Sequence, residues 1–422
     1  MGQTEDKAAR PLDALNFFLA DVRDGLGPYL AIYLLTVQKW DEASIGFTLS
    51  AAAIAGIVAQ TPAGALIDAT RAKRTVLIVA AIAITVASLA IPFVPGLVPV
   101  TLLQALSGMA GAIFPPAIAA VTLGIVGPKA FARRIGRNEA FNHAGNASAA
   151  LLAGGFAYWF GPIAVFWLMA AMAVASIAAT LAIDPKAIDH DVARGLHDAQ
   201  DDKADPARPS GLRVLLASPP LLVFAASTTL FHFANAAMLP LVGQKLALAS
   251  PDLGTTLMSA CIVAAQLVMV PVALVVGARA DRWGRKPIFA AALAVLCLRG
   301  LLYPLSDAPG WLIGVQLLDG VGAGIFGALF PLIVSDLTRG TGHFNVAQGA
   351  IATAQGIGGA LSTAVAGAIV YTYGYSAAFV TLGVLAGLGL VLLLALLPET
   401  RDLPGSRPDG GTPPLSGQPA AG

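Results

Sequence analysis

Residues 277–286 read Gly-Ala-Arg-Ala-Asp-Arg-Trp-Gly-Arg-Lys and lie between two long apolar runs. About 212 residues earlier, residues 64–74 read Gly-Ala-Leu-Ile-Asp-Ala-Thr-Arg-Ala-Lys-Arg, again between two apolar runs. In both stretches an acid follows a glycine by four residues, and basic residues come next. A charged turn that recurs between apolar runs predicts a membrane protein built from two similar halves.

The composition supports the membrane class. Of the 422 residues, 57% are hydrophobic and only 12% are charged, whereas a soluble chain carries about 25% charged residues. The 25 Lys and Arg balance 24 Asp and Glu, so no basic surface for nucleic acid is expected. The two cysteines, Cys261 and Cys297, lie in apolar runs and indicate no disulfide framework.

Apolar runs of about 20 residues predict membrane-spanning helices. Twelve are expected, at residues 12–36, 43–69, 74–93, 98–126, 136–158, 163–183, 217–241, 254–278, 287–305, 311–337, 344–372 and 375–397. The expected fold class is therefore an all-α integral membrane protein with twelve transmembrane helices in two parallel six-helix repeats.

The basic residues set the expected orientation. With the N-terminus inside, Lys39 and Lys245 are the two basic residues assigned to the outer side, so both termini are expected to be cytoplasmic, in the cytoplasmic (inner) membrane. The expected domains are an N-terminal bundle (1–183), a solvated cytoplasmic linker (184–213), a C-terminal bundle (214–397) and a disordered tail (398–422).

The repeat extends beyond the charged turns. Residues 104–108 (Gln-Ala-Leu-Ser-Gly) align with 316–320 (Gln-Leu-Leu-Asp-Gly) at the same offset, which also aligns Pro28 with Pro240. Six spans return the chain to its starting side, so the two halves are parallel repeats, as in many secondary transporters.

The two charged turns and the repeat resemble the major facilitator superfamily over nearly the whole chain. The resemblance implies alternating access between two six-helix halves, with spans 1, 4, 7 and 10 around a central cavity. The chain departs from the drug exporters of that family, because Gln104 and Ser107 precede Gly108 where those proteins carry an arginine before a Gln-Gly pair.

The charged turns are interpreted as gating loops, because an acid beside arginines forms hydrogen bonds that a moving helix can make and break. The alternative is simple anchoring at the membrane surface, with the glycines allowing close helix contact. The residues assigned to these loops are Gly64, Asp68, Arg71, Gly277, Asp281, Arg282 and Arg285.

Polar residues at membrane depth are the candidates for the pathway of solute and protons. They are Asp21, Arg23 and Asp24 in the first span, Gln104 in the fourth, Glu139, Asn142, His143 and Asn146 in the fifth, His232 and Asn235 in the seventh, and Gln316 and Asp319 in the tenth. Gln60, Gln266, Gln348 and Gln355 are weaker candidates.

Each group has a structural alternative. The first-span triad leaves a formal charge of −1 and suits a titrating site, or is self-neutralised. The fifth-span residues share one helix face and line a pathway, or join helices by hydrogen bonds, with Glu139 free to pair with Arg134. His232 is equally a core histidine. Gln104 and Gln316 are expected to face each other across the cavity, and Arg299 with Asp319 is interpreted first as a structural ion pair.

The eleventh-span counterparts of the fifth-span face are mostly apolar. We therefore expect coupling in the first half and solute contacts mainly in the second.

The expected function is secondary active transport of a small organic solute, coupled to protons, with export favoured by its frequency in the family. Uptake of a metabolite is the main alternative, and a divalent-metal carrier using Asp21, Asp24, His143 and His232 is another. A membrane enzyme is not expected, since no nucleophile stands near the histidines, and no phosphate-binding loop indicates a pump. The expected partners are the solute, protons and the lipid bilayer, with no cofactor, no resident metal and a monomeric chain.

Overall fold

The computed structural model describes residues 2–24, 30, 33–34, 37–40, 42–94, 96–161, 163–196, 218–249 and 254–402. Within these ranges the chain forms helices and short turns and has no strand. This confirms the all-α class.

The helices fall into two groups along the chain. The first comprises α1 (Gly2–Asp24), α3 (Glu42–Ala69), α4 (Lys73–Ala90), α5 (Leu97–Gly111), α6 (Phe114–Phe160) and α7 (Ala164–Ala182). The second comprises α9 (Pro219–Ala236), α10 (Met238–Ala249), α11 (Gly254–Trp283), α12 (Arg285–Leu302), α13 (Pro309–Thr338) and α14 (Phe344–Leu396). Short 3-10 turns are η1 (Ile91–Phe93), η2 (Pro185–Ala187), η3 (Val192–Arg194), η5 (Tyr303–Leu305) and η6 (Thr400–Asp402).

Two of the helices are each a pair of spans joined at a glycine. In α6 the backbone turns at Gly127 (φ 69°), and in α14 it turns at Gly374 (φ 83°). A positive φ is open to glycine and strained for most other residues. Gly340 (φ 73°) and Gly161 (φ 78°) stand 213 residues from Gly127 and Gly374 respectively, so the repeat is visible in the backbone itself.

The two kinks explain why the structure has fewer long helices than the number of expected spans. Nine stretches of the described residues are long and apolar enough to cross a membrane, and the two kinked ones each contain two spans. The fourth span is α5 followed by the start of α6, and the seventh is α9 followed by α10. The first span follows α1 to Asp24, and most of its remainder, residues 25–36, lies outside the described residues.

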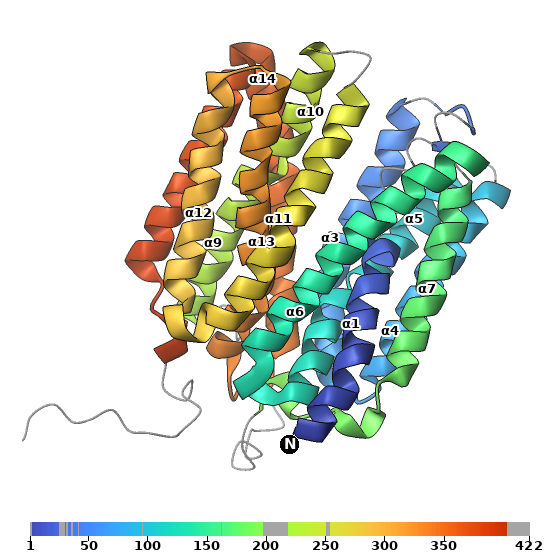
Figure 1. Ribbon diagram of the computed structural model, residues 1–422, viewed down its shortest axis with the longest axis vertical. Coiled ribbons are helices and arrows are strands. Elements are labelled where there is room, and N and C mark those ends of the chain that lie inside the picture. The colour runs from blue at the N-terminus through green and yellow to red at the C-terminus, as the bar shows by residue number, and fades with distance from the viewer. Residues whose placement is uncertain are drawn as a thin grey trace, which may run out of the picture.

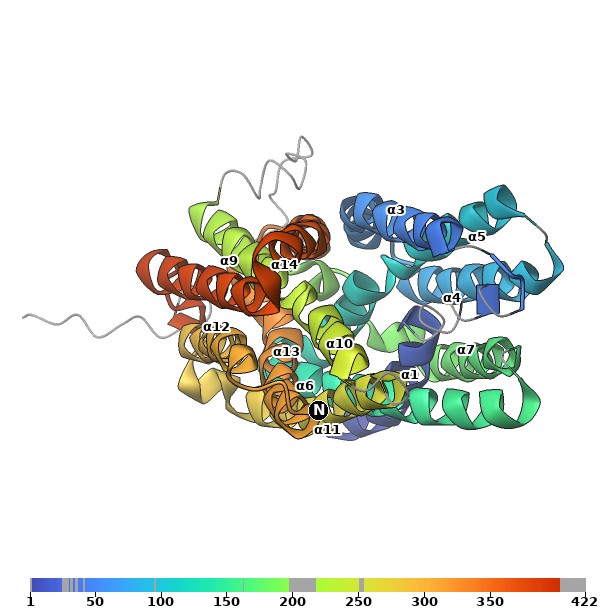
Figure 2. The ribbon, with the colours of Figure 1, turned by 90° about the horizontal axis from the view of Figure 1, so that it is seen from above.

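The two groups of helices lie side by side (Figures 1 and 2), with α1 to α7 in blue to green and α9 to α14 in yellow-green to red. Buried apolar residues form separate clusters inside them. Two clusters belong to the first group, and the largest fills the second group and extends onto α6. We call the two groups the first and second halves.

At one end of the molecule lie the connections 69–73 and 283–285 and the segment 183–196; we call this the linker end, and the start of α1 lies there, at the bottom of Figure 1. The segment expected to be a solvated linker is packed over its first part. The backbone N–H of Asp189 donates to Gly124, and Ile188, Ala193 and Leu196 are buried. Small apolar residues among the charges anchor it, and residues 197–213 lie outside the described part.

The start of the expected disordered tail is also packed. The Glu399 carboxylate accepts hydrogen bonds from the backbone N–H groups of Arg285 (2.8 Å) and Lys286 (3.1 Å), at the first turn of α12. This arrangement satisfies donors that a helix start leaves unpaired. Residues 403–422 lie outside the described residues.

Candidate functional site

Glycines bring the two halves into backbone contact at the linker end. A Cβ added to Gly64 of α3 would lie 2.2 Å from the carbonyl oxygen of Asn345 in α14. One added to Gly136 of α6 would lie 2.6 Å from the Cα of Gly277 in α11. Gly64 and Gly277 are repeat counterparts. Gly136 and Gly349 are repeat counterparts as well, and a Cβ added to Gly349 would lie 2.2 Å from the carbonyl oxygen of Gln60 in α3. The repeat therefore produces two equivalent crossings between the halves.

Asp68 seals the α3–α14 crossing. Its carboxylate accepts hydrogen bonds from the backbone N–H of Val346 (2.8 Å), from the backbone N–H of Asn345 (3.3 Å) and from the Asn345 side chain (2.7 Å). A carboxylate at the start of a helix satisfies its free N–H groups and complements its dipole. Asn345 also donates to the carbonyl of Ala193 (3.0 Å), so the segment 183–196 is part of the same junction. Arg71 is exposed beside it.

The second charged turn is placed differently from the first. The Asp281 side chain is 61% exposed and pairs with Arg285 (2.7 Å). Arg285 also pairs with Asp336 (3.0 Å), and the backbone carbonyls of Asp281 and Arg282 accept hydrogen bonds from Arg401. All these partners belong to the second half. Around Gly277, four residues before Asp281, the second half meets Ala132 and Gly136 inside α6, whereas Asp68 meets the start of α14.

His190 lies beside the first charged turn and remains a neutral imidazole near neutral pH. Partial burial lowers the pKa of His190, and the charges of Lys73 and Arg71 lower it further. The cavity next to it, about 50 Å³, is lined by Asp68 and Arg194 among others. This part of the junction therefore does not depend on a charged histidine near neutral pH.

The fifth-span face meets the second half. The Nδ1 of His143 lies 2.8 Å from Oε1 of Gln266 on α11, and its Nε2 lies 3.9 Å from the Glu139 carboxylate. Glu139 and Asn142 line a cavity of about 100 Å³ together with Asn16. Asn146 lies further along the same helix and is half-buried. The face is thus shared between a cavity and a contact between the halves.

Glu139 does not pair with Arg134. The Arg134 guanidinium instead donates to Asp13 of α1 (2.7 Å) and to Asn138 (2.8 Å), and Arg137 also pairs with Asp13 (2.6 Å). Asp13 was not among the sequence candidates, since it lies where the first span begins and resembled a membrane-surface charge. Its burial shows that it joins α1 to α6.

The first-span triad is described only in part. Asp21 is buried in α1. The side chains of Arg23 and Asp24 lie outside the described residues, so their predicted interaction stays a prediction.

A larger polar cavity of about 480 Å³ lies between α3, α5 and α14. Its polar lining consists of five uncharged side chains, which are Gln60, Ser88, Gln104, Ser107 and Gln348. Pro115, Phe330 and Gln348 also line the smaller cavity at Glu139, so the two cavities adjoin. Most of the lining belongs to the first half.

Gln316 does not face Gln104. It is fully buried in the second half, where its Oε1 accepts from the Tyr303 hydroxyl (2.5 Å) and from Arg299 (3.2 Å), and its Nε2 donates to Asp319 (3.0 Å). The Arg299 guanidinium pairs with Asp319 (2.6 Å) and donates to Asn235 (2.5 Å). The expected ion pair between Arg299 and Asp319 is present. The Gln316 amide, which was expected to bind solute, is hydrogen-bonded to both members of this pair.

His232 is engaged within its own half. Its Nδ1 lies 3.1 Å from the carbonyl oxygen of Thr228, one turn earlier, and its ring meets Phe326 edge to face. This favours the structural interpretation of that histidine. Within the described ranges, no three His, Cys, Asp or Glu side chains gather closely enough to hold a metal ion.

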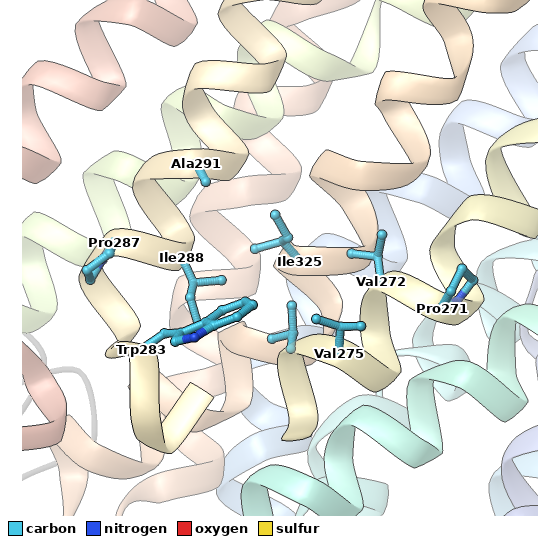
Figure 3. A pocket seen from close by; sticks show the side chains of 9 residues that line it. Pro271, Val272, Val275, Trp283, Pro287, Ile288, Ala291 and Ile325 are labelled. Atoms are coloured by element: carbon cyan, nitrogen blue, oxygen red, sulfur yellow. The ribbon is translucent and has the colours of Figure 1, made fainter. Parts of the chain in front are cut away.

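A further groove, of about 440 Å³, is apolar throughout (Figure 3). It is lined by Pro271, Val272, Val275, Val276, Trp283, Pro287, Ile288, Ala291 and Ile325. Val275 and Trp283 are half-exposed, as side chains facing lipid are. The groove offers no polar group to a solute.

These features define a class of protein: a multi-span carrier of two repeated halves, which meet at one end and enclose polar cavities. The sequence profile of the Major Facilitator Superfamily matches residues 13–340 and 233–419. The MFS-type transporter Rv2456c of Mycobacterium tuberculosis (strain H37Rv) is 61% identical over 396 residues, 94% of each chain. MT2531, an MFS-type transporter of strain CDC 1551 of the same species, is also 61% identical over 396 residues, 94% of each chain. The chain belongs to the major facilitator superfamily and is a membrane transporter, not an enzyme.

Solved structures show the same fold at low sequence identity. The proton:xylose symporter XylE is similar with a TM-score of 0.70 at 12% identity, over 94% of this chain and 96% of that one. The human organic anion transporter MFSD10 is similar with a TM-score of 0.63 at 14% identity, over 92% and 97% of the two chains. At these identities the likeness concerns the fold alone.

Proposed function

We propose that the protein is a proton-coupled secondary transporter that exports a small organic solute by alternating access, described here with its linker end closed. The observation that carries the proposal is the Asp68 carboxylate on the start of α14, which joins the two halves by three hydrogen bonds. Opening the linker end requires these bonds to break. The acid in this turn therefore has a gating role that membrane anchoring would not require.

The α6–α11 crossing offers a coupling group. A protonated His143 carries a proton on both ring nitrogens. Its Nδ1 lies within hydrogen-bond distance of Oε1 of Gln266 across the halves, and its Nε2 lies at ion-pair distance, 3.9 Å, from the Glu139 carboxylate on its own helix. A neutral imidazole has one donor and no charge to attract Glu139. Asp13, Arg134 and Arg137 are paired with one another. Protonation of His143 therefore favours the closed linker end, which links proton binding to the transport cycle.

The orientation we propose has the linker end in the cytoplasm of the inner membrane, with both termini there. The basic residues support it. Lys73, Arg74, Arg282 and Arg285 lie at the linker end, whereas Lys245 lies on α10. A membrane protein keeps its basic loops in the cytoplasm.

The closure is tested by a disulfide between the halves. The hydroxyl oxygens of Thr61 and Thr353 lie 3.0 Å apart across α3 and α14. In a chain carrying Cys261→Ala and Cys297→Ala, the Thr61→Cys/Thr353→Cys pair is expected to cross-link and to stop transport until a reductant is added. Thr48 and Thr101, whose hydroxyl oxygens lie 2.9 Å apart, are within the first half. Thr48→Cys/Thr101→Cys is the matched control and is expected to leave transport intact when oxidised.

Transport itself is measured in inside-out and right-side-out vesicles given a small-molecule cell extract. Mass spectrometry identifies solutes that accumulate with the reduced Thr61→Cys/Thr353→Cys protein and not with its oxidised form. Accumulation in inside-out vesicles that an uncoupler abolishes supports proton-coupled export. Accumulation in right-side-out vesicles would reverse the direction, and indifference to the uncoupler would reject the coupling.

A further inference from the structure

We infer that the 480 Å³ cavity between α3, α5 and α14 binds an uncharged solute that carries several hydroxyl or amide groups. This inference rests on the proposed transport function and adds the chemical class of the solute. It stands on the lining of the cavity and on a comparison of the two repeats.

The lining supplies hydrogen-bonding groups without charge. Three of its polar atoms are buried with no hydrogen-bond partner in the described structure: Oε1 of Gln60, Oγ of Ser107 and Nε2 of Gln348. A buried polar atom without a partner is costly, so these atoms require a complementary ligand or water. An apolar solute would leave all three unsatisfied.

A charged solute fits this lining no better. None of the described residues around the cavity is ionisable. A charge moved out of water into such a site has no opposite charge to compensate its lost hydration. Among the described residues, a charged group lies in the adjoining cavity, where Glu139 stands beside His143. The site for protons and the site for solute are thus neighbours with different chemistry.

The second half shows how the same position is satisfied when no solute enters. Gln316 is the repeat counterpart of Gln104, and its Oε1 accepts hydrogen bonds from Tyr303 and Arg299. In the first half these two residues correspond to Ile91 and Ala87, which cannot donate. The side chains that fill the second-half niche are therefore missing from the first half, and a cavity takes their place.

The repeat also indicates which groups the solute presents. In the second half the amide accepts from an O–H and an N–H group and donates to a carboxylate oxygen of Asp319. In the first half Ser107 stands at the position of Asp319, so the negative charge is absent together with the positive one. A solute with neutral hydroxyl or amide groups supplies the same hydrogen-bond donors and acceptors. It does not need the charges that Arg299 and Asp319 carry in the second half.

One test reads the charge preference without knowing the solute. Ser107→Cys in the chain with Cys261→Ala and Cys297→Ala is treated in vesicles with three methanethiosulfonates, bearing a hydroxyethyl, a trimethylammonioethyl or a sulfonatoethyl group. Rates are divided by those at Lys39→Cys, an exposed position. The uncharged reagent is expected to react at least tenfold faster than either charged one. Equal rates, or no reaction with any reagent, would overturn the inference.

The vesicle assay supplies an independent reading. Solutes whose accumulation depends on the protein are expected to be uncharged at neutral pH and rich in hydroxyl or amide groups. A transported solute with a net charge would reject the inference while leaving the proposed function standing. If no solute is transported, the proposed function fails, and the reagent rates at position 107 still decide the chemistry of the cavity.

Discussion

Asp68 and Asp281 occupy equivalent positions in the repeat, yet only Asp68 reaches across the halves. We expect Asp68→Asn to weaken closure of the linker end by about 1–2 kcal/mol, the usual value of a helix-capping acid. Asp281→Asn is expected to change it little, since that side chain is exposed and bonded within its own half. The measurement is the rate of disulfide formation in the Thr61→Cys/Thr353→Cys background. Equal effects of the two substitutions would argue against the assigned gate.

His143 gives a second prediction at this scale. Because the protonated ring carries a proton on each nitrogen, cross-linking of positions 61 and 353 should increase on acidification when it is divided by the cross-linking of the Thr48→Cys/Thr101→Cys pair, which cancels the lower thiolate fraction. His143→Gln should remove this dependence while the protein stays folded and cross-linkable.

Asp21→Asn serves as the comparison for His143→Gln, since the sequence placed the coupling group in the first span. If Asp21→Asn abolishes the pH dependence and His143→Gln leaves it, coupling belongs to the first span.

Arg299 is the most deeply buried charge among the described residues of the second half. Removing one member of a buried ion pair strands the other, at a cost of about 3–5 kcal/mol. Arg299→Ala is therefore expected to lower the thermal unfolding temperature markedly. Arg299→Ala/Asp319→Ser removes both charges and should recover part of the loss. A double variant no more stable than Arg299→Ala would show that packing, rather than the stranded carboxylate, dominates.

At the level of elements, the crossing of α6 and α11 depends on the absence of side chains. Gly136→Ala places a methyl group against the backbone of Gly277, so the helices must separate. We expect this variant to form little disulfide between positions 61 and 353.

Gly155→Ala is the matched control in the same helix, because nothing lies within 4 Å of its added Cβ. It is expected to behave as the unmodified protein. If both alanine variants cross-link normally, the glycine crossing does not govern closure.

The sequence predicted the spans well because each is a long local signal. It also predicted the repeat, the charged turns and the Arg299–Asp319 pair. It missed the bond from Asp68 to Asn345, which lies 277 positions further along the chain, since a bond between two crossing helices depends on how the halves dock. It also treated Gln104 and Gln316 as equals, whereas the residues at equivalent places on other helices, Arg299 and Tyr303 for Gln316 and the apolar Ala87 and Ile91 for Gln104, decide what each amide does.

At the level of the whole molecule, the segment 183–196 touches both halves. The backbone N–H of Asp189 donates to Gly124 of the first half, and from the second half Asn345 donates to Ala193 and the backbone N–H of Gly340 donates to Gly195. Opening the linker end must free this segment from at least one half. Trypsin cleavage after Arg194 should therefore be slow in the oxidised Thr61→Cys/Thr353→Cys protein and faster in Asp68→Asn. Equal cleavage rates in these two proteins would show that the segment 183–196 is not released when the halves separate.

The niche occupied by Arg299 has a consequence for stoichiometry. Two equivalent niches would let the carrier load two solute molecules per cycle, and binding of the first could alter binding of the second. Here one niche is sealed by the protein's own guanidinium, and the other is a cavity. We therefore expect the carrier to take one molecule per turnover, with a rate that rises hyperbolically with solute concentration and a Hill coefficient of about one.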